Sequence, residues 1–222
     1  MIELLKTHIK NKHSDKVIQL LQSNPEILEL KDANGSSGFM LMAYSGLETI
    51  FKEAIELKTS FSFYEAIISG KIEQVRKYLK QSNSAIVNTH STDGFTPLSL
   101  AAFFNQTEIA KTLVDNGADP NIHATNPSKV NALHAAVAKE NYKLCELFIK
   151  MGIDINAVQT RHVTALHSAV HRGNLDLTQL LIKNGAIIDL KMDNGDTALI
   201  IAKREGHKQI EKYLYKNEKS NT

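Results

Sequence analysis

Short apolar stripes at helical spacing alternate with polar breaks along most of the chain. In the stretch that begins at Thr96, the apolar residues Leu98, Ala101 and Ala102 fall on one face of a predicted helix. Thr96 is a suitable N-cap and Pro97 a suitable first helical residue, because the missing N–H of proline has no intrahelical partner there. A polar break follows, and a second amphipathic segment comes after it. The pattern predicts a pair of short helices.

This helix pair recurs at a nearly constant period. Four segments share a polar cap, a small or proline residue and a leucine, and they begin at positions 96, 131, 164 and 197. Each is followed nine or ten positions later by a helix break and then by a second amphipathic helix. Three of the second helices end at a glycine, which terminates helices at little conformational cost. A period near 33 residues indicates a repeat architecture.

These features resemble the ankyrin repeat, with its T-P-L-H signature, its break and its G-A-D-x-N exit, over residues 87–215. The resemblance implies an all-α solenoid of about seven helix-turn-helix units with short β-hairpin loops, each unit stacking only on its neighbours. The unit starts are expected near residues 3, 37, 61, 96, 131, 164 and 197. We expect a single domain over 1–218 and a frayed tail at 219–222.

Two spacings depart from the family pattern. The N-terminal units are degenerate, and Ser37 lies only 24 residues before Phe61, so the hairpin near 57–61 is expected to be missing. Conversely, an insert at 125–129 should make one hairpin two residues longer.

Composition and charge narrow the function classes. The 222 residues include 26 basic and 24 acidic residues, a balance that argues against nucleic acid as the partner. The single cysteine, Cys145, permits no internal disulfide and favours a reducing compartment. The N-terminus lacks the features of a signal peptide, and no apolar run reaches membrane-spanning length. We expect a cytoplasmic protein with no membrane partner, and secretion as an effector remains an alternative.

The candidate catalytic and metal-binding residues have simpler structural interpretations. His134 and His167 occupy the fourth signature position, which in the family satisfies backbone groups of adjoining loops. His167 and His171 share a helix face, but the spacing suggests no third metal ligand. Cys145 lies at a core position, and no nucleotide-binding or hydrolase motif is present. We expect no enzyme, cofactor, metal or small-molecule substrate; the remote alternative is an unrecognised catalytic pocket near 57–63.

The resemblance places binding residues in the hairpin tips and the outer positions of the first helices, which line a concave groove. Three aromatic rings are expected in the open, in the middle of the array: Phe95, Phe103 and Phe104. Clustered exposed apolar groups usually mark an interaction site, and aromatic residues often anchor interfaces. In the alternative interpretation, Phe103 and Phe104 pack under the neighbouring hairpin.

A basic rim is expected on the C-terminal side of this groove. Its residues are Arg161, His171, Arg172, Lys191 and Arg204. Other predicted groove positions are His90, Thr92, Asp93, Val130 and Lys139. The basic residues could instead be merely solvated.

The predicted function is binding of another protein, by a monomer, through this groove. An acidic or amphipathic segment would suit the basic rim. An alternative is an effector, inhibitor or immunity-type protein that blocks a specific enzyme, and the sequence does not separate the two.

Overall fold

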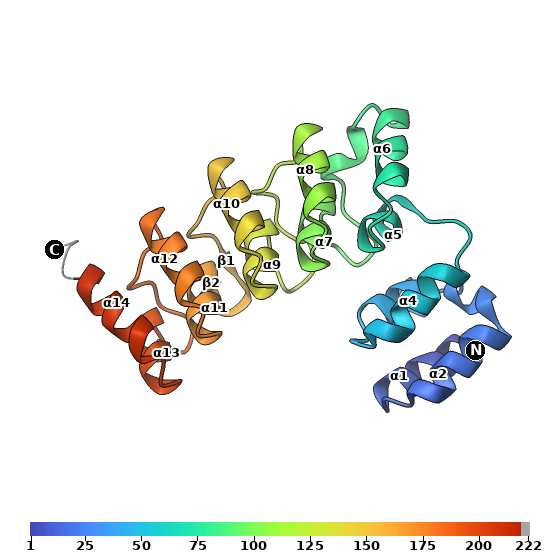
Figure 1. Ribbon diagram of the computed structural model, residues 1–222, viewed down its shortest axis with the longest axis horizontal. Coiled ribbons are helices and arrows are strands. Elements are labelled where there is room, and N and C mark those ends of the chain that lie inside the picture. The colour runs from blue at the N-terminus through green and yellow to red at the C-terminus, as the bar shows by residue number, and fades with distance from the viewer. Residues whose placement is uncertain (219–222) are drawn as a thin grey trace. The chain divides into compact units, whose positions relative to one another are not determined.

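The computed structural model describes residues 1–218 and is almost entirely helical, with fourteen α-helices in this range (Figure 1). The tail predicted at 219–222 lies outside the described residues. The chain divides into two compact units, Met1–Tyr78 and a second that begins at Leu79. A single domain over 1–218 therefore stays a prediction. Between residues 1 and 218, no helix has the length and apolar character needed to cross a membrane.

Helix pairs with a common buried core make up the first unit. Phe39, Ile50 and Ile67 are among its buried side chains, and α3 packs against α1 and α4. Its elements are α1 (Ile2–Lys10), α2 (Ser14–Ser23), η1 (Pro25–Leu28), α3 (Gly38–Ala43), α4 (Glu48–Leu57), α5 (Phe63–Ile68) and most of α6 (Ile72–Gln81).

Residues 58–62 join α4 directly to α5, and this stretch contains no strand, as the short spacing predicts. The side chain of Lys58 is only 1% exposed and forms ion pairs with Glu29 and Glu65. Its Nζ also lies 5.4 Å from the centroid of the Phe39 ring. The Glu65 carboxylate accepts further hydrogen bonds from the Ser62 amide and hydroxyl. A buried polar cluster therefore occupies the place of the missing hairpin.

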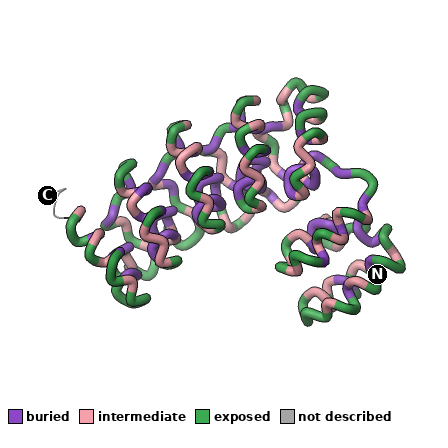
Figure 2. The backbone as a smooth tube through the Cα atoms, viewed as in Figure 1, coloured by how far each residue is buried: buried purple, intermediate pink, exposed green. Residues whose placement is uncertain are grey.

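The second unit is a row of helix pairs in two layers (Figure 1). The first helices contact one another in the order α7, α9, α11 and α13, and α8, α10, α12 and α14 form the outer layer. Figure 2 shows the outer helices exposed on the side that faces away from the first helices. The elements are η2 (Ala85–Asn88), α7 (Pro97–Phe103), α8 (Thr107–Asp115), α9 (Ala132–Ala138), α10 (Tyr142–Lys150), α11 (Ala165–His171), α12 (Leu175–Lys183), α13 (Ala198–Arg204) and α14 (Lys208–Glu218).

Each first helix of this unit begins at the residue that the sequence predicts. The Thr96 hydroxyl accepts a hydrogen bond from the Ser99 amide at 3.1 Å, and Pro97 is the first residue of α7. Asn131, Thr164 and Thr197 cap the following first helices in the same way. One loop forms a strand pair, β1 (Val158–Gln159) with β2 (Val163–Thr164), around the turn η3 (Thr160–His162).

Asparagine side chains bridge successive helix pairs through the loops that follow the second helices. The Asn88 amide donates to the Gly117 carbonyl at 3.0 Å and accepts from the Asp119 amide at 2.9 Å. Asn156 repeats this arrangement with the backbone of Gly185 and Ile187. Asn121 bonds the backbone of the next exit loop in the same two ways. These bridges fix the spacing of the stack.

Candidate functional site

Hydrogen bonds link the hairpin tips of the second unit into one continuous edge. Asn126 donates its side-chain amide to the Asp93 carbonyl at 2.8 Å. The Thr160 amide donates to the Ser128 carbonyl at 3.0 Å, and the Asp193 amide donates to the Arg161 carbonyl at 3.1 Å. The insert predicted at 125–129 thus supplies contacts to the tips on both of its sides.

The tips and the C-terminal ends of the first helices share one surface. The Arg204 guanidinium, at the end of α13, lies 2.5 Å from the Asp196 carboxylate in the tip that precedes α13. We call this the front surface; it comprises the tips 90–95, 123–130, 158–163 and 191–196 and the helix ends 103–105, 138–140, 171–173 and 204–206.

Two aromatic rings and a lysine meet on the front surface, and we call them the aromatic cluster: Phe103, Phe104 and Lys139. The Phe103 side chain is 37% exposed, and its ring centroid lies 5.2 Å from that of Phe104 in an edge-to-face arrangement. The Lys139 Nζ, from the end of α9, lies 4.4 Å from the Phe103 centroid, within the range of a cation–π contact.

The expectation of three open rings needs correction. Phe103 is exposed, but Phe95 and Phe104 are half-buried. Phe104 packs edge-on against Phe103, and Phe95 lies in a tip that Ser91 closes, since the Ser91 hydroxyl accepts from the Phe95 amide at 3.0 Å.

Three members of the predicted basic rim are paired with carboxylates of the chain itself. His171 lies 3.4 Å from Glu205, Arg172 lies 3.9 Å from Glu140, and Arg204 pairs with Asp196 and Glu205. The hydrogen bond from Arg204 lowers the pKa of Asp196 and raises that of Arg204. Within residues 1–218, Arg161 and Lys191 are exposed and form no ion pair. The rim is therefore neutralised in part.

The remaining predicted groove residues mostly hold the tips together. The Nε2 of His90 is hydrogen-bonded to the His123 carbonyl at 2.9 Å. The Asp93 carboxylate accepts from the Ser91 hydroxyl, and the half-buried Val130 accepts from the Ala124 amide through its carbonyl. Thr92 is exposed.

The two signature histidines have the structural role that the resemblance implies. His134 is bonded through Nε2 to the Ala157 carbonyl at 3.1 Å, and His167 through Nε2 to the Leu190 carbonyl at 3.0 Å. Burial lowers the pKa of His134 to about 4 and also lowers that of His167, so both rings are neutral at pH 7. No three His, Cys, Asp or Glu side chains of residues 1–218 are grouped as metal ligands.

Cys145 is fully buried, as predicted, and burial raises its pKa to about 12. The thiol therefore stays protonated and inert at neutral pH.

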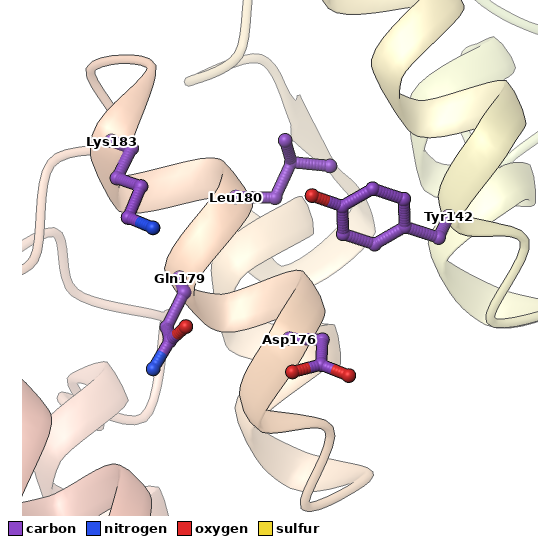
Figure 3. Close-up of a pocket in the computed structure, with 5 residues that line it drawn as sticks. All are labelled: Tyr142, Asp176, Gln179, Leu180 and Lys183. Atoms are coloured by element: carbon purple, nitrogen blue, oxygen red, sulfur yellow. The ribbon is translucent and has the colours of Figure 1, made fainter.

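A pocket of about 300 Å³ lies on the outer layer, between α10 and α12 (Figure 3). The Tyr142 ring extends from α10 toward Leu180 of α12, with Asp176, Gln179 and Lys183 along α12. We assign this pocket no chemistry.

Comparison with known proteins gives consistent matches over nearly the whole chain. A family model described as "Ankyrin repeats (3 copies)" matches residues 5–124, 63–159 and 133–222. Human ankyrin repeat and KH domain-containing protein 1 is 34% identical over 102 residues, which is 46% of this chain and 4% of that protein. Human ankyrin repeat domain-containing protein 17 is 39% identical over 72 residues, 32% of this chain and 3% of that protein.

A third relative is a cation channel. The human transient receptor potential cation channel subfamily A member 1 is 31% identical over 106 residues, 47% of this chain and 9% of the channel. The chain thus spans less than a tenth of each of these three relatives.

Proposed function

Because the chain belongs to the ankyrin-repeat family, whose repeats generally mediate binding between proteins, we propose that it binds a partner protein through the front surface. The observation that carries this proposal is the aromatic cluster, in which Phe103 exposes an apolar ring beside the Lys139 ammonium. The partner segment docks with an apolar side chain on Phe103 and Phe104.

The repeat itself does not require aromatic residues at these positions. The positions equivalent to Phe103 in the next three units hold Ala138, His171 and Arg204. The aromatic ring at the end of α7 is therefore particular to this unit and is not required by the repeat fold. Aromatic residues are enriched at the centres of interfaces, because they bury a large area with few rotatable bonds.

The test is affinity capture from native lysate with the double variant Phe103→Ala/Phe104→Ala. We expect the variant to lose the captured partner, since truncation of an anchor at an interface centre typically costs about 2 kcal/mol or more. The matched control is Tyr142→Ala, which removes an aromatic ring of similar exposure, 41%, from the outer layer. Thermal unfolding of both variants shows whether each remains folded.

Equal capture by the wild type and the folded double variant would overturn the proposal. Loss of capture by Tyr142→Ala alone would instead place the binding surface on the outer layer, and would also overturn it.

A further inference from the structure

The carboxylates and the cations of the front surface differ in whether they have a charged or hydrogen-bonding partner within the chain, although the chain as a whole is nearly neutral. Every carboxylate of this surface has a partner within the chain. Asp93 accepts from Ser91, and Asp193 lies 2.5 Å from His162. The other three carboxylates are in the ion pairs given above, with Glu140 also accepting from Asn174 at 2.8 Å.

Four cations of the same surface have no such partner: Lys129, Lys139, Arg161 and Lys191. All four are exposed, and in the described part of the chain none forms an ion pair with a carboxylate. They come from three successive units, those of α9, α11 and α13. The carboxylates of this surface are therefore held by partners within the chain, whereas these four cations face solvent without a carboxylate partner.

Two of these cations have a left-handed backbone conformation, Arg161 and also Lys129, whose φ is +52°. Arg161 has φ +61° and ψ +25°, a left-handed conformation that costs a residue with a Cβ about 1–2 kcal/mol. Two other tips use glycine for a positive φ, at Gly94 and Gly195. Strain of this kind is concentrated at functional positions, where the surrounding structure maintains it. Here the Asp193 amide donates to the Arg161 carbonyl and so ties the backbone at Arg161 to the neighbouring tip.

We infer that the partner segment is acidic, and that Lys129, Lys139, Arg161 and Lys191 select it. This inference rests on the proposed function and specifies the partner's chemistry. Packed helices lie about 8–10 Å apart, and an extended chain advances about 3.3 Å per residue. An extended segment with Asp or Glu about every third residue thus meets the cations of successive units. An apolar residue at its start lies on Phe103.

The observations favour an acidic protein segment over nucleic acid. The five carboxylates of the front surface lie among the cations, and the net charge of the chain is only +2. A phosphate backbone carries a charge at every nucleotide and would meet these carboxylates, whereas an acidic peptide can place its charges selectively.

The experiment selects a phage-displayed library of random 12-residue peptides on the immobilised full chain. We expect the enriched peptides to be rich in Asp and Glu and to contain an apolar residue.

One enriched peptide is then labelled and titrated by fluorescence polarisation. Its affinity should fall about tenfold in the quadruple variant K129Q/K139Q/R161Q/K191Q, as for the loss of several surface ion pairs, and should weaken with added salt. The matched control H171Q/R172Q/R204Q removes three side chains of the basic rim that already contact carboxylates of the chain and should change the affinity less than threefold.

Three outcomes would overturn the inference: selected peptides without acidic enrichment, an equal loss of affinity in the two variant sets, or equally tight, cation-dependent binding of single-stranded DNA. The proposed function is judged separately, by lysate capture with Phe103→Ala/Phe104→Ala and with Tyr142→Ala as described above, and neither variant changes the four cations.

Discussion

At the scale of the residue, His134 shows how one side chain joins two repeats. Its Nδ1 accepts the Asn131 amide within its own unit, and its Nε2 bonds the Ala157 carbonyl of the next loop. The ring must be neutral to accept at Nδ1, and its side chain is buried. Protonation therefore breaks a bond and places a charge in the core.

Stability should consequently fall on acidification. The pKa of His134 is about 4 in the folded chain and 6.5 when unfolded, so below pH 6.5 the unfolded state binds the proton more strongly. The stabilisation is complete above pH 6.5 and is lost as the pH falls toward 4, by about 3 kcal/mol from this group. Urea unfolding between pH 7.5 and 4 measures the slope. The His134→Gln variant should show a shallower slope, and an unchanged slope would refute this account.

At the scale of the element, the hairpin tips depend on close backbone approach at one glycine. Gly94 has φ +83°, and a Cβ there would lie 2.8 Å from the Thr125 Oγ1 and 2.9 Å from the Asn126 amide nitrogen. Gly195 has nearly the same φ, +82°, but a Cβ there would meet nothing within 4 Å. The two positions separate backbone strain from crowding.

Gly94→Ala should therefore destabilise the chain more than Gly195→Ala. Both substitutions impose the left-handed strain on alanine, and only the first displaces the neighbouring tip, for about 1 kcal/mol more. Chemical denaturation of the two variants compares them directly. Equal losses of stability would mean that the 123–130 tip can shift to accommodate the added Cβ without a cost in free energy.

Sequence periodicity predicts the helix pairs well, because caps, stripes and glycine stops recur in register. Thr96, His134 and Cys145 all have their predicted roles for this reason. The front surface was predicted less well. The pairing of Arg172 with Glu140 joins two units, and it depends on side-chain directions that a period does not specify. The half-burial of Phe104 likewise follows from its packing on Phe103, which adjacent positions in a sequence do not reveal.

At the scale of the whole molecule, stability in a stack of repeats is the sum of local terms, since each pair contacts only its neighbours. The buried cluster around Lys58 belongs to the first unit, and Glu65 in that cluster is only 8% exposed. Loss of the lysine leaves this carboxylate buried without its cation.

Lys58→Ala should lower the stability of the first unit by about 3 kcal/mol, the usual loss when a buried ion pair is broken. Hydrogen exchange, read at amides of α3 and α5, should report this loss, while amides of α11 should change little. Lys52→Ala removes an exposed lysine of α4, the helix that ends just before Lys58; it is the control and should change exchange in neither unit. An equal change at α11 would show that the two units unfold together.

The asparagine bridges have a consequence for how such a protein diversifies. The side chains of Asn88, Asn121 and Asn156 bond only backbone atoms of the following loop, and at the donor position any residue type except proline offers the same amide. Ile187 shows this, because its amide meets Asn156 at a position where the two preceding units carry Asp119 and Asp154. Mutation can therefore change the neighbouring side chains without loosening the joint. Lineages that inherit this stack can acquire new recognition residues while the connection between repeats is preserved.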